Sequence, residues 1–197
     1  MLLQHCEVLT VLSRKLLIAA VVGNCAIVML SFAVLGWNAE GAGSATRNTA
    51  RFAIAFFLAG LAAPGLKRWI LSFPEPPALI HAFVAAQLIH FGCVALLHTW
   101  FAQGNFHLSF GELAITVVGF SLVVTAGATA IHRPGQRWYS AVHIFMLYVI
   151  FLILAADYRE HPVKPLRLML VPVLLAMLLR HLPRRREAKS LGAGASS

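Results

Sequence analysis

The chain has few charged residues and few cysteines, and both shortages restrict the class of protein to which it can belong. Only 12% of its 197 residues are charged and 59% are hydrophobic, whereas soluble domains carry about 25% charged residues. Its three cysteines, Cys6, Cys25 and Cys93, are too few and too scattered for a disulfide framework or an iron–sulfur site. No C-x-x-C-H motif and no glycine-rich nucleotide loop occurs. The composition therefore indicates a membrane protein.

Long apolar runs fill most of the chain and predict an all-α fold. A stretch of about 20 apolar residues is long enough to cross a bilayer as a helix, and a backbone in lipid must satisfy its own hydrogen bonds. Six such stretches occur, at 16–36, 51–71, 78–100, 111–131, 138–157 and 163–181. They predict a polytopic membrane protein, a bundle of six transmembrane helices.

The runs also predict how the chain is divided. Residues 16–181 form one transmembrane domain, preceded by a cytoplasmic segment at 1–15 and followed by a disordered, basic cytoplasmic tail at 182–197. Small and polar residues at 38–50 predict a loop between the first two spans. The first apolar run is too long for a typical cleaved signal peptide, so we expect it to be a retained helix.

Basic residues are divided unequally between the two sides of the expected bundle. Eleven of the 16 Lys and Arg residues lie at the chain ends and in the connections between spans 2 and 3 and spans 4 and 5. The positive-inside rule then places both termini in the cytoplasm. We expect the protein to lie in the inner (plasma) membrane of the cell. Anchoring to anionic membrane lipid explains the net charge of +9, without any nucleic acid.

Histidines inside the expected spans are the first candidates for function, because ionisable residues in a membrane are costly. Within 78–100, helical geometry turns His81 and His90 to opposite faces and separates His90 from His98 by about 12 Å along the axis. One metal ion held within this helix is therefore disfavoured. Spans 3 and 5 run parallel, so His90 and His143 could flank a flat macrocycle such as haem, with His81 as an alternative ligand.

A simpler interpretation of His90 stays open, in which it bonds a polar group of a neighbouring helix. Available partners are Gln87, Thr116, Ser121, Thr125 and Thr129. Gly119 and Gly127 in the fourth span either allow close helix packing or make room for a planar cofactor. A small transporter is disfavoured, because Glu112 and Asp157 lie only at the ends of spans.

Three segments resemble the ferric-reductase-like transmembrane domain, and the similarity covers about residues 16–181. They are RNTARFAIAFFLAGLAAPGLKRW (47–69), LIHAFVAAQLIHF (79–91) and GQRWYSAVHIFMLYVIFLILAADY (135–158). His90 falls at the position of that family's haem-ligand histidine, and Trp138, His143 and Tyr148 follow its Trp–His–Tyr order. The family includes the haem-binding membrane subunit of the bacterial methionine sulfoxide reductase system and, more distantly, NADPH oxidases.

This resemblance implies a b-type haem protein, the membrane component of an oxidoreductase, which passes single electrons to or from a separate redox partner protein. The donor would be that partner, a flavin or a quinol, because we expect no flavin or nucleotide domain after residue 181. Arg51 or Arg137 would pair with a haem propionate, or else anchor the chain at the membrane surface.

Two departures from the family pattern limit this expectation. A second histidine would stand about thirteen residues after His143, where Ala156 is found, so at most one haem is expected. His90 and His143 also differ in depth by roughly 10 Å along their helices. The alternative is therefore a haem-free membrane scaffold or assembly subunit of the same fold.

Overall fold

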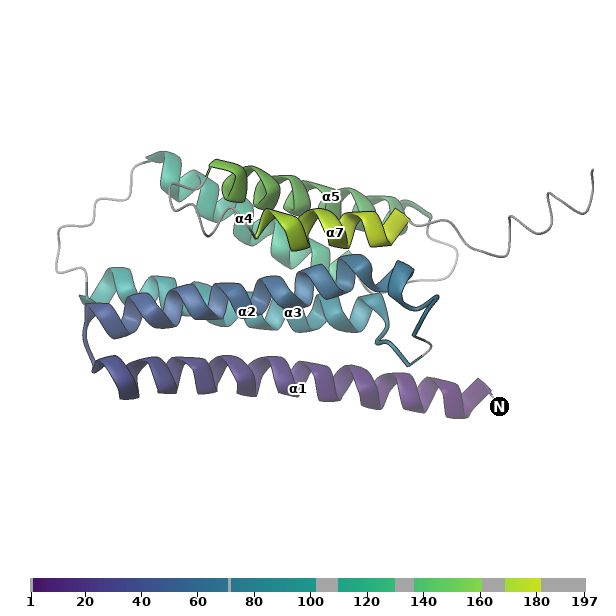
Figure 1. The fold of residues 1–197 in the computed structure, drawn as a ribbon, viewed down its shortest axis with the longest axis horizontal. Coiled ribbons are helices and arrows are strands. Elements are labelled where there is room, and N and C mark those ends of the chain that lie inside the picture. Colours follow the sequence, from purple (N-terminus) through teal and green to yellow (C-terminus); the bar gives the residue numbers. More distant parts are fainter. Residues whose placement is uncertain (1, 71, 102–109, 130–136, 161–168, 182–197) are drawn as a thin grey trace, which may run out of the picture.

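The part of the chain that the computed structural model describes is all-helical, which confirms the predicted fold class. It comprises residues 2–70, 72–101, 110–129, 137–160 and 169–181. Its α-helices are α1 (Leu2–Leu35), α2 (Ala39–Leu66), α3 (Pro76–Leu96), α4 (Phe110–Thr129), α5 (Arg137–Glu160) and α7 (Leu170–His181). One π-helical turn, η1 (Leu97–Phe101), extends α3. Consecutive α-helices run in opposite directions (Figure 1).

Three of these helices are long and apolar enough to cross a membrane. The qualifying segments are Ser13–Leu35, Ala39–Leu66 and Pro76–Phe101, while α4, α5 and α7 carry shorter apolar stretches. Large apolar side chains also lie on the outer surface, such as Met29 at 73% exposure and Val34 at 70%. Apolar surface of this extent suits lipid rather than water, which indicates a membrane protein.

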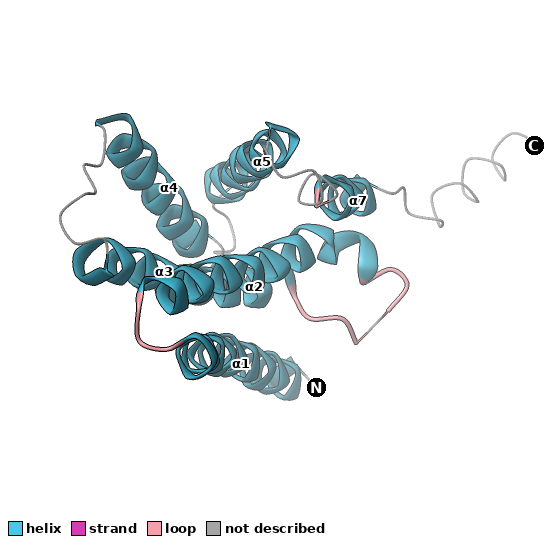
Figure 2. Ribbon diagram, turned by 60° about the vertical axis from the view of Figure 1, so that its left-hand side comes forward, coloured by secondary structure: helices cyan, strands magenta, loops and turns pink. Residues whose placement is uncertain are grey.

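The pair formed by α2 and α3 lies at the centre of the bundle. Helix α1 packs on one side of this pair, and α4, α5 and α7 lie on the other side (Figures 1 and 2). The core between these helices is apolar, and its largest fully buried apolar side chains are Phe57, Leu61, Ile80, Leu147 and Val173. This packing holds α3 between helices on two sides.

The predicted loop at 38–50 is wrong, because α2 begins at Ala39. The Asn38 side chain caps the helix by accepting hydrogen bonds from the backbone N–H groups of Glu40 and Gly41, at 2.9 and 3.0 Å. Gly36 supplies the reversal before the cap with a φ of +84°, a conformation that glycine adopts without steric cost. The small residues that suggested a loop are packed instead, since Gly41, Ala42 and Ala45 are buried.

Other boundaries also differ from the predicted ones. Helix α1 extends back to Leu2, so the segment expected at 1–15 continues the first helix from its second residue. The third apolar run was expected to begin at residue 78, whereas α3 begins with Pro76 and Pro77, where a missing N–H costs no helical hydrogen bond. The tail at 182–197 and the connection at 161–168 lie outside the described residues.

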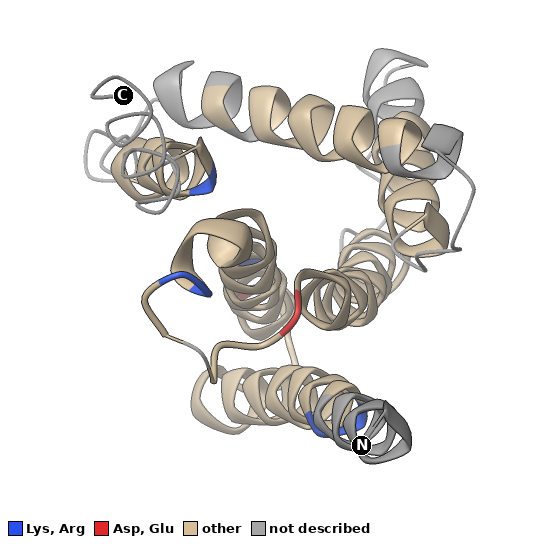
Figure 3. Ribbon diagram, turned by 90° about the vertical axis from the view of Figure 1, so that its right-hand side faces the viewer, with Lys and Arg blue, Asp and Glu red and all other residues tan. Residues whose placement is uncertain are grey.

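Basic residues gather at one end of the bundle (Figure 3). This end carries the described residues Arg14, Lys15, Lys67, Arg68 and Arg180. Lys67 forms an ion pair there with Glu75 across the connection between α2 and α3. The opposite end of the bundle, where α2 begins, carries Arg47 and Arg51, both exposed, together with Glu40. We call the end that carries Lys67, Arg68 and Arg180 the basic end.

Candidate cofactor-binding site

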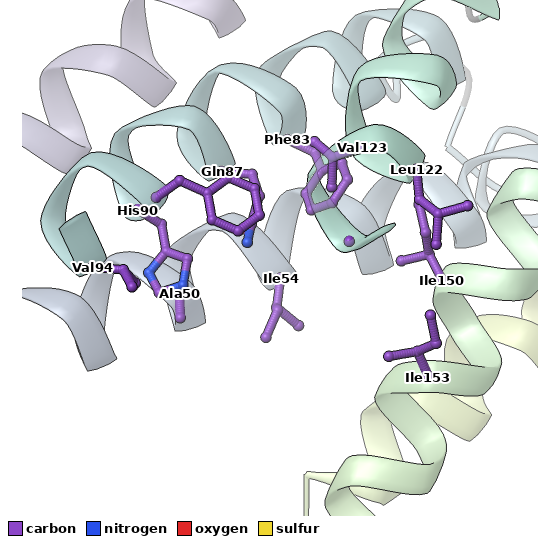
Figure 4. Close-up of a pocket in the computed structure, with 12 residues that line it drawn as sticks. Ala50, Ile54, Phe83, Gln87, His90, Val94, Leu122, Val123, Ile150 and Ile153 are labelled. Atoms are coloured by element: carbon purple, nitrogen blue, oxygen red, sulfur yellow. The ribbon is translucent and has the colours of Figure 1, made fainter. Parts of the chain in front are cut away.

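A cavity of about 380 Å³ lies between α2, α3, α4 and α5. Its lining consists of Ala50, Ile54, Phe83, Gln87, His90, Phe91, Val94, Gly119, Leu122, Val123, Ile150 and Ile153. Gln87 and His90 are the two polar side chains in this set, and Figure 4 shows both on α3, across the cavity from Ile150 and Ile153 of α5. Mostly apolar walls with a few polar groups, in a volume of this order, are typical of cofactor and ligand sites.

The His90 ring is held on the side facing α2. Its Nδ1 lies 3.1 Å from the backbone carbonyl oxygen of Thr46 and 3.3 Å from Oγ1 of Thr49. A carbonyl oxygen only accepts, so Nδ1 carries the proton and donates it. Thr49 is fully buried, and its hydroxyl donates to the carbonyl of Ala45 at 2.8 Å. Its oxygen is then free to accept from Nδ1 as well.

This bonding leaves the other ring nitrogen of His90 as a base. With the proton on Nδ1, Nε2 of a neutral imidazole keeps its lone pair. Nε2 makes no hydrogen bond to any described residue. An Nδ1–H held by a carbonyl group, with Nε2 open to a cavity, is the usual second-shell arrangement of a metal-ligating histidine.

The two glycines considered in the fourth span have different roles. A Cβ added at Gly127 would lie 2.9 Å from a methyl group of Val84, so this glycine permits α3 and α4 to pack closely. A Cβ added at Gly119 would meet nothing within 4 Å, and Gly119 lines the cavity. Gly119 therefore adds room beside His90, as a planar ligand would require.

The structure does not bring His143 to this cavity. The α5 residues in its wall are Ile150 and Ile153, and Ile150 is seven residues, or roughly 10 Å of helix, beyond His143. His143 is bonded nearer the basic end instead, with its Nδ1 3.3 Å from Oγ1 of Thr129 on α4. The depth difference expected from the sequence is thus present in the structure.

Two other sequence-derived candidates, His81 and Arg51, do not line the cavity. His81 is half-buried near the start of α3, close enough to His143 for the two rings to interact electrostatically. Arg51 is exposed and donates to Oδ1 of Asn48 on its own helix at 3.3 Å. Arg137 is the first residue of α5, and its side chain lies outside the described part of the chain.

His98 belongs to a second cavity, toward the end of the bundle opposite the basic one. It lies in η1, and with Thr99 it lines a space of about 420 Å³ between α3 and α4. Phe91 and Val94 contribute to both cavities. His98 is therefore separated from the His90 ring, as the helical spacing predicted.

Sequence reasoning missed the residues that bond His90. Its proposed partners were on α3 and α4, whereas the observed ones, Thr46 and Thr49, lie in the segment interpreted as a loop. The available signal was Asn38 followed by an acidic residue at Glu40, which is typical of a helix start. A helix beginning there carries both threonines toward α3.

No group of three or more His, Cys, Asp or Glu side chains that could hold a metal ion occurs among the described residues. Comparisons with protein-family models, with characterised proteins and with solved structures find no match for this chain.

Proposed function

We propose that this chain is a membrane-embedded b-type haem protein that passes single electrons for a separate redox partner. The observation that carries the proposal is His90, whose Nδ1–H is held by Thr46 and Thr49 while its Nε2 is left as a base beside an apolar cavity. The resemblance of 47–69, 79–91 and 135–158 to the ferric-reductase-like domain supports the same reading.

The residues of the cavity suit such a cofactor. When bound, haem accepts and returns one electron at its iron, whose potential follows from its axial ligands and surroundings. His90 would be the axial ligand, with its ring held in place by α2. Phe83, Leu122 and Ile150 would exclude water from the macrocycle, and Gly119 would leave space for it. Among the described residues, the wall offers Gln87 but no second histidine.

The proposed orientation in the membrane follows from the charges. Six spans with the basic end in the cytoplasm would agree with the positive-inside rule, because this end carries Lys67, Arg68 and Arg180. We place the protein in the inner (plasma) membrane, with anionic lipid around the basic end. A cytoplasmic flavin, a flavin-carrying protein or a quinol in the membrane would deliver one electron at a time.

An absorption spectrum tests the proposal directly. Full-length protein, expressed with added haem precursor and purified in detergent, is expected to show a Soret band that shifts on reduction with dithionite. About one haem per chain should be extracted as the pyridine complex, since b-type haem is not covalently attached. Colourless protein that still elutes as a single folded species would refute the proposal.

Reporter fusions test the six-span arrangement. Alkaline phosphatase fused after residue 43 is expected to be active, because the start of α2 would face outward, whereas the same enzyme fused after residue 134 should be inactive. Green fluorescent protein should give the opposite pattern at the two positions. Equal signals at both positions would contradict the arrangement.

A haem-free scaffold is the second candidate, and one observation favours it. Both His90 and His143 bond across helices, to Thr49 of α2 and Thr129 of α4. Such bonds would satisfy buried histidines without any cofactor. The scaffold predicts that supplied haem leaves the thermal stability of the protein unchanged, whereas a resident cofactor should raise it.

A further inference from the structure

His90 and His143 are held in the same way, although they lie on different helices. In each case the ring of a histidine faces a buried threonine of the preceding helix. Nδ1 of His90 lies 3.3 Å from Oγ1 of Thr49, and Nδ1 of His143 lies 3.3 Å from Oγ1 of Thr129. Thr49 and Thr129 are two of only four buried polar residues in the described part of the chain.

The two threonine hydroxyls also form the same pattern of hydrogen bonds within their own helices. Oγ1 of Thr49 lies 2.8 Å from the carbonyl oxygen four residues earlier and 3.0 Å from that of Thr46, three residues earlier. Oγ1 of Thr129 likewise lies 2.7 Å from the carbonyl oxygen of Thr125, four residues earlier, and 3.3 Å from that of Ala126, three residues earlier. A hydroxyl has one proton, so each donates it to its own helix and keeps its lone pairs as acceptors.

The carbonyl three residues before each threonine completes the arrangement. The Thr46 carbonyl accepts from Nδ1 of His90 at 3.1 Å, and the His143 ring has a backbone hydrogen-bond partner in Ala126. Nδ1 of each ring also lies beside a threonine oxygen whose own proton is donated within its helix, which favours the tautomer with the proton on Nδ1. Each Nε2 is left unprotonated.

We propose that Thr49 and Thr129 are positioning residues that fix the tautomer and the orientation of His90 and His143, so that both histidines present Nε2 as a base to the interior of the bundle. Thr49 and Thr129 would act through the histidines and would not contact a ligand themselves. For His90 this deepens the proposed function, because an axial ligand needs an unprotonated Nε2 in a fixed direction. For His143 it holds with or without a cofactor.

The test is nitrogen NMR of the full-length, haem-free protein in lipid bilayers, with ¹⁵N-labelled histidine at about pH 8.5, where ordinary imidazoles are neutral. His90→Ala and His143→Ala identify the two signals. In the wild type, both histidines should show a protonated Nδ1 and an unprotonated Nε2. Thr49→Val should broaden the His90 signal and make its other tautomer detectable, without affecting His143. Thr129→Val should do the reverse.

Matched variants separate positioning from packing. Thr49→Ser and Thr129→Ser keep the hydroxyl and should restore the wild-type signals. Thr125→Val is the control, because its hydroxyl donates to the Ser121 carbonyl at 2.7 Å and has no hydrogen bond to a described histidine. It should leave both signals unchanged.

Three outcomes would overturn the inference: an Nε2–H tautomer in the wild type, valine variants with unchanged signals, or an effect found in only one of the two threonine–histidine pairs. A haem-loaded sample distinguishes this inference from the proposed function. If haem binds, the affinity of the Thr49→Val protein for haem should be roughly 10-fold lower than that of the wild type. The affinity of the Thr125→Val protein should be unchanged. If the wild type binds no haem, the NMR result still decides the role of the threonines.

Discussion

Replacing Gly65 by alanine is expected to separate α7 from α2 and to destabilise the whole bundle. A Cβ at this position would lie 1.8 Å from the backbone carbonyl oxygen of Leu179 and 2.6 Å from its carbonyl carbon. Both are backbone atoms, so no side-chain rotation relieves the clash, and one helix must move. Because α7 covers α2 along this contact, the movement would open the core around Val173 and Leu61.

The magnitudes show which effect prevails in Gly65→Ala. Alanine in place of glycine favours the helix by about 1 kcal/mol, whereas overpacking of a filled interior costs about 1–3 kcal/mol. A backbone obstacle belongs at the upper end of that range. The net loss of about 2 kcal/mol should lower the melting temperature of the detergent-solubilised protein by roughly 6 °C. We expect Gly65→Val to leave little folded protein in size-exclusion chromatography.

Gly92→Ala is the matched control on another helix of the bundle. It adds the same methyl group to α3, at an exposed position where a Cβ would meet nothing within 4 Å. Only the gain in helix propensity remains there, so the melting temperature should stay the same or rise slightly. Gly65→Ala protein that melts like Gly92→Ala protein would show that α2 and α7 do not pack as described.

The helical elements could be predicted from the sequence because their signal is local. A run of about 20 apolar residues identifies a helix in lipid without reference to other parts of the chain. Each predicted span overlaps one observed helix, although the length needed to cross a membrane is found for α1, α2 and α3 with its π-helical turn. Boundaries at prolines were also predictable, as at Pro76, because a missing N–H affects only its immediate neighbours.

The start of α2 was mispredicted because polarity was taken as evidence for a loop. Between helices in a membrane, small residues are favoured since they allow backbones to approach closely. Gly41 shows a close backbone approach of this kind at the turn between α1 and α2, because a Cβ there would lie 2.3 Å from the carbonyl oxygen of Gly36. Small and polar residues occur both in loops exposed to water and in helix contacts within lipid. Composition alone therefore does not distinguish a loop from a helix here.

The candidate site was predictable in part. His90 could be singled out from its position in the middle of an apolar run, and helix geometry alone indicated that His90 and His143 differ in depth. Its partners could not be found in this way. Thr49 and His90 are 41 residues apart, and which faces of α2 and α3 meet depends on the packing of the whole bundle.

His90→Ala is expected to lower the haem content of the purified protein by roughly 10-fold or more, since loss of the ligand should cost at least as much as loss of a second-shell bond. The cavity offers no replacement, because its other polar side chain is the amide of Gln87. Added imidazole should restore binding in this variant, since the missing ring leaves space of its own shape beside Thr46 and Thr49. The measurement is the haem-to-protein ratio with and without imidazole.

His143→Ala gives the decisive comparison with His90→Ala. The α5 wall of the cavity is formed by Ile150 and Ile153, so His143 should not ligate the iron and its removal should leave the haem content unchanged. His98→Ala should also retain haem, because His98 lines the other cavity.

With His90 as the single protein ligand, the reduced iron should be five-coordinate and bind carbon monoxide. A sharp α band that is lost equally in His90→Ala and His143→Ala would instead show that both histidines ligate one iron. The bundle would then have to bring α3 and α5 to the same level when haem binds.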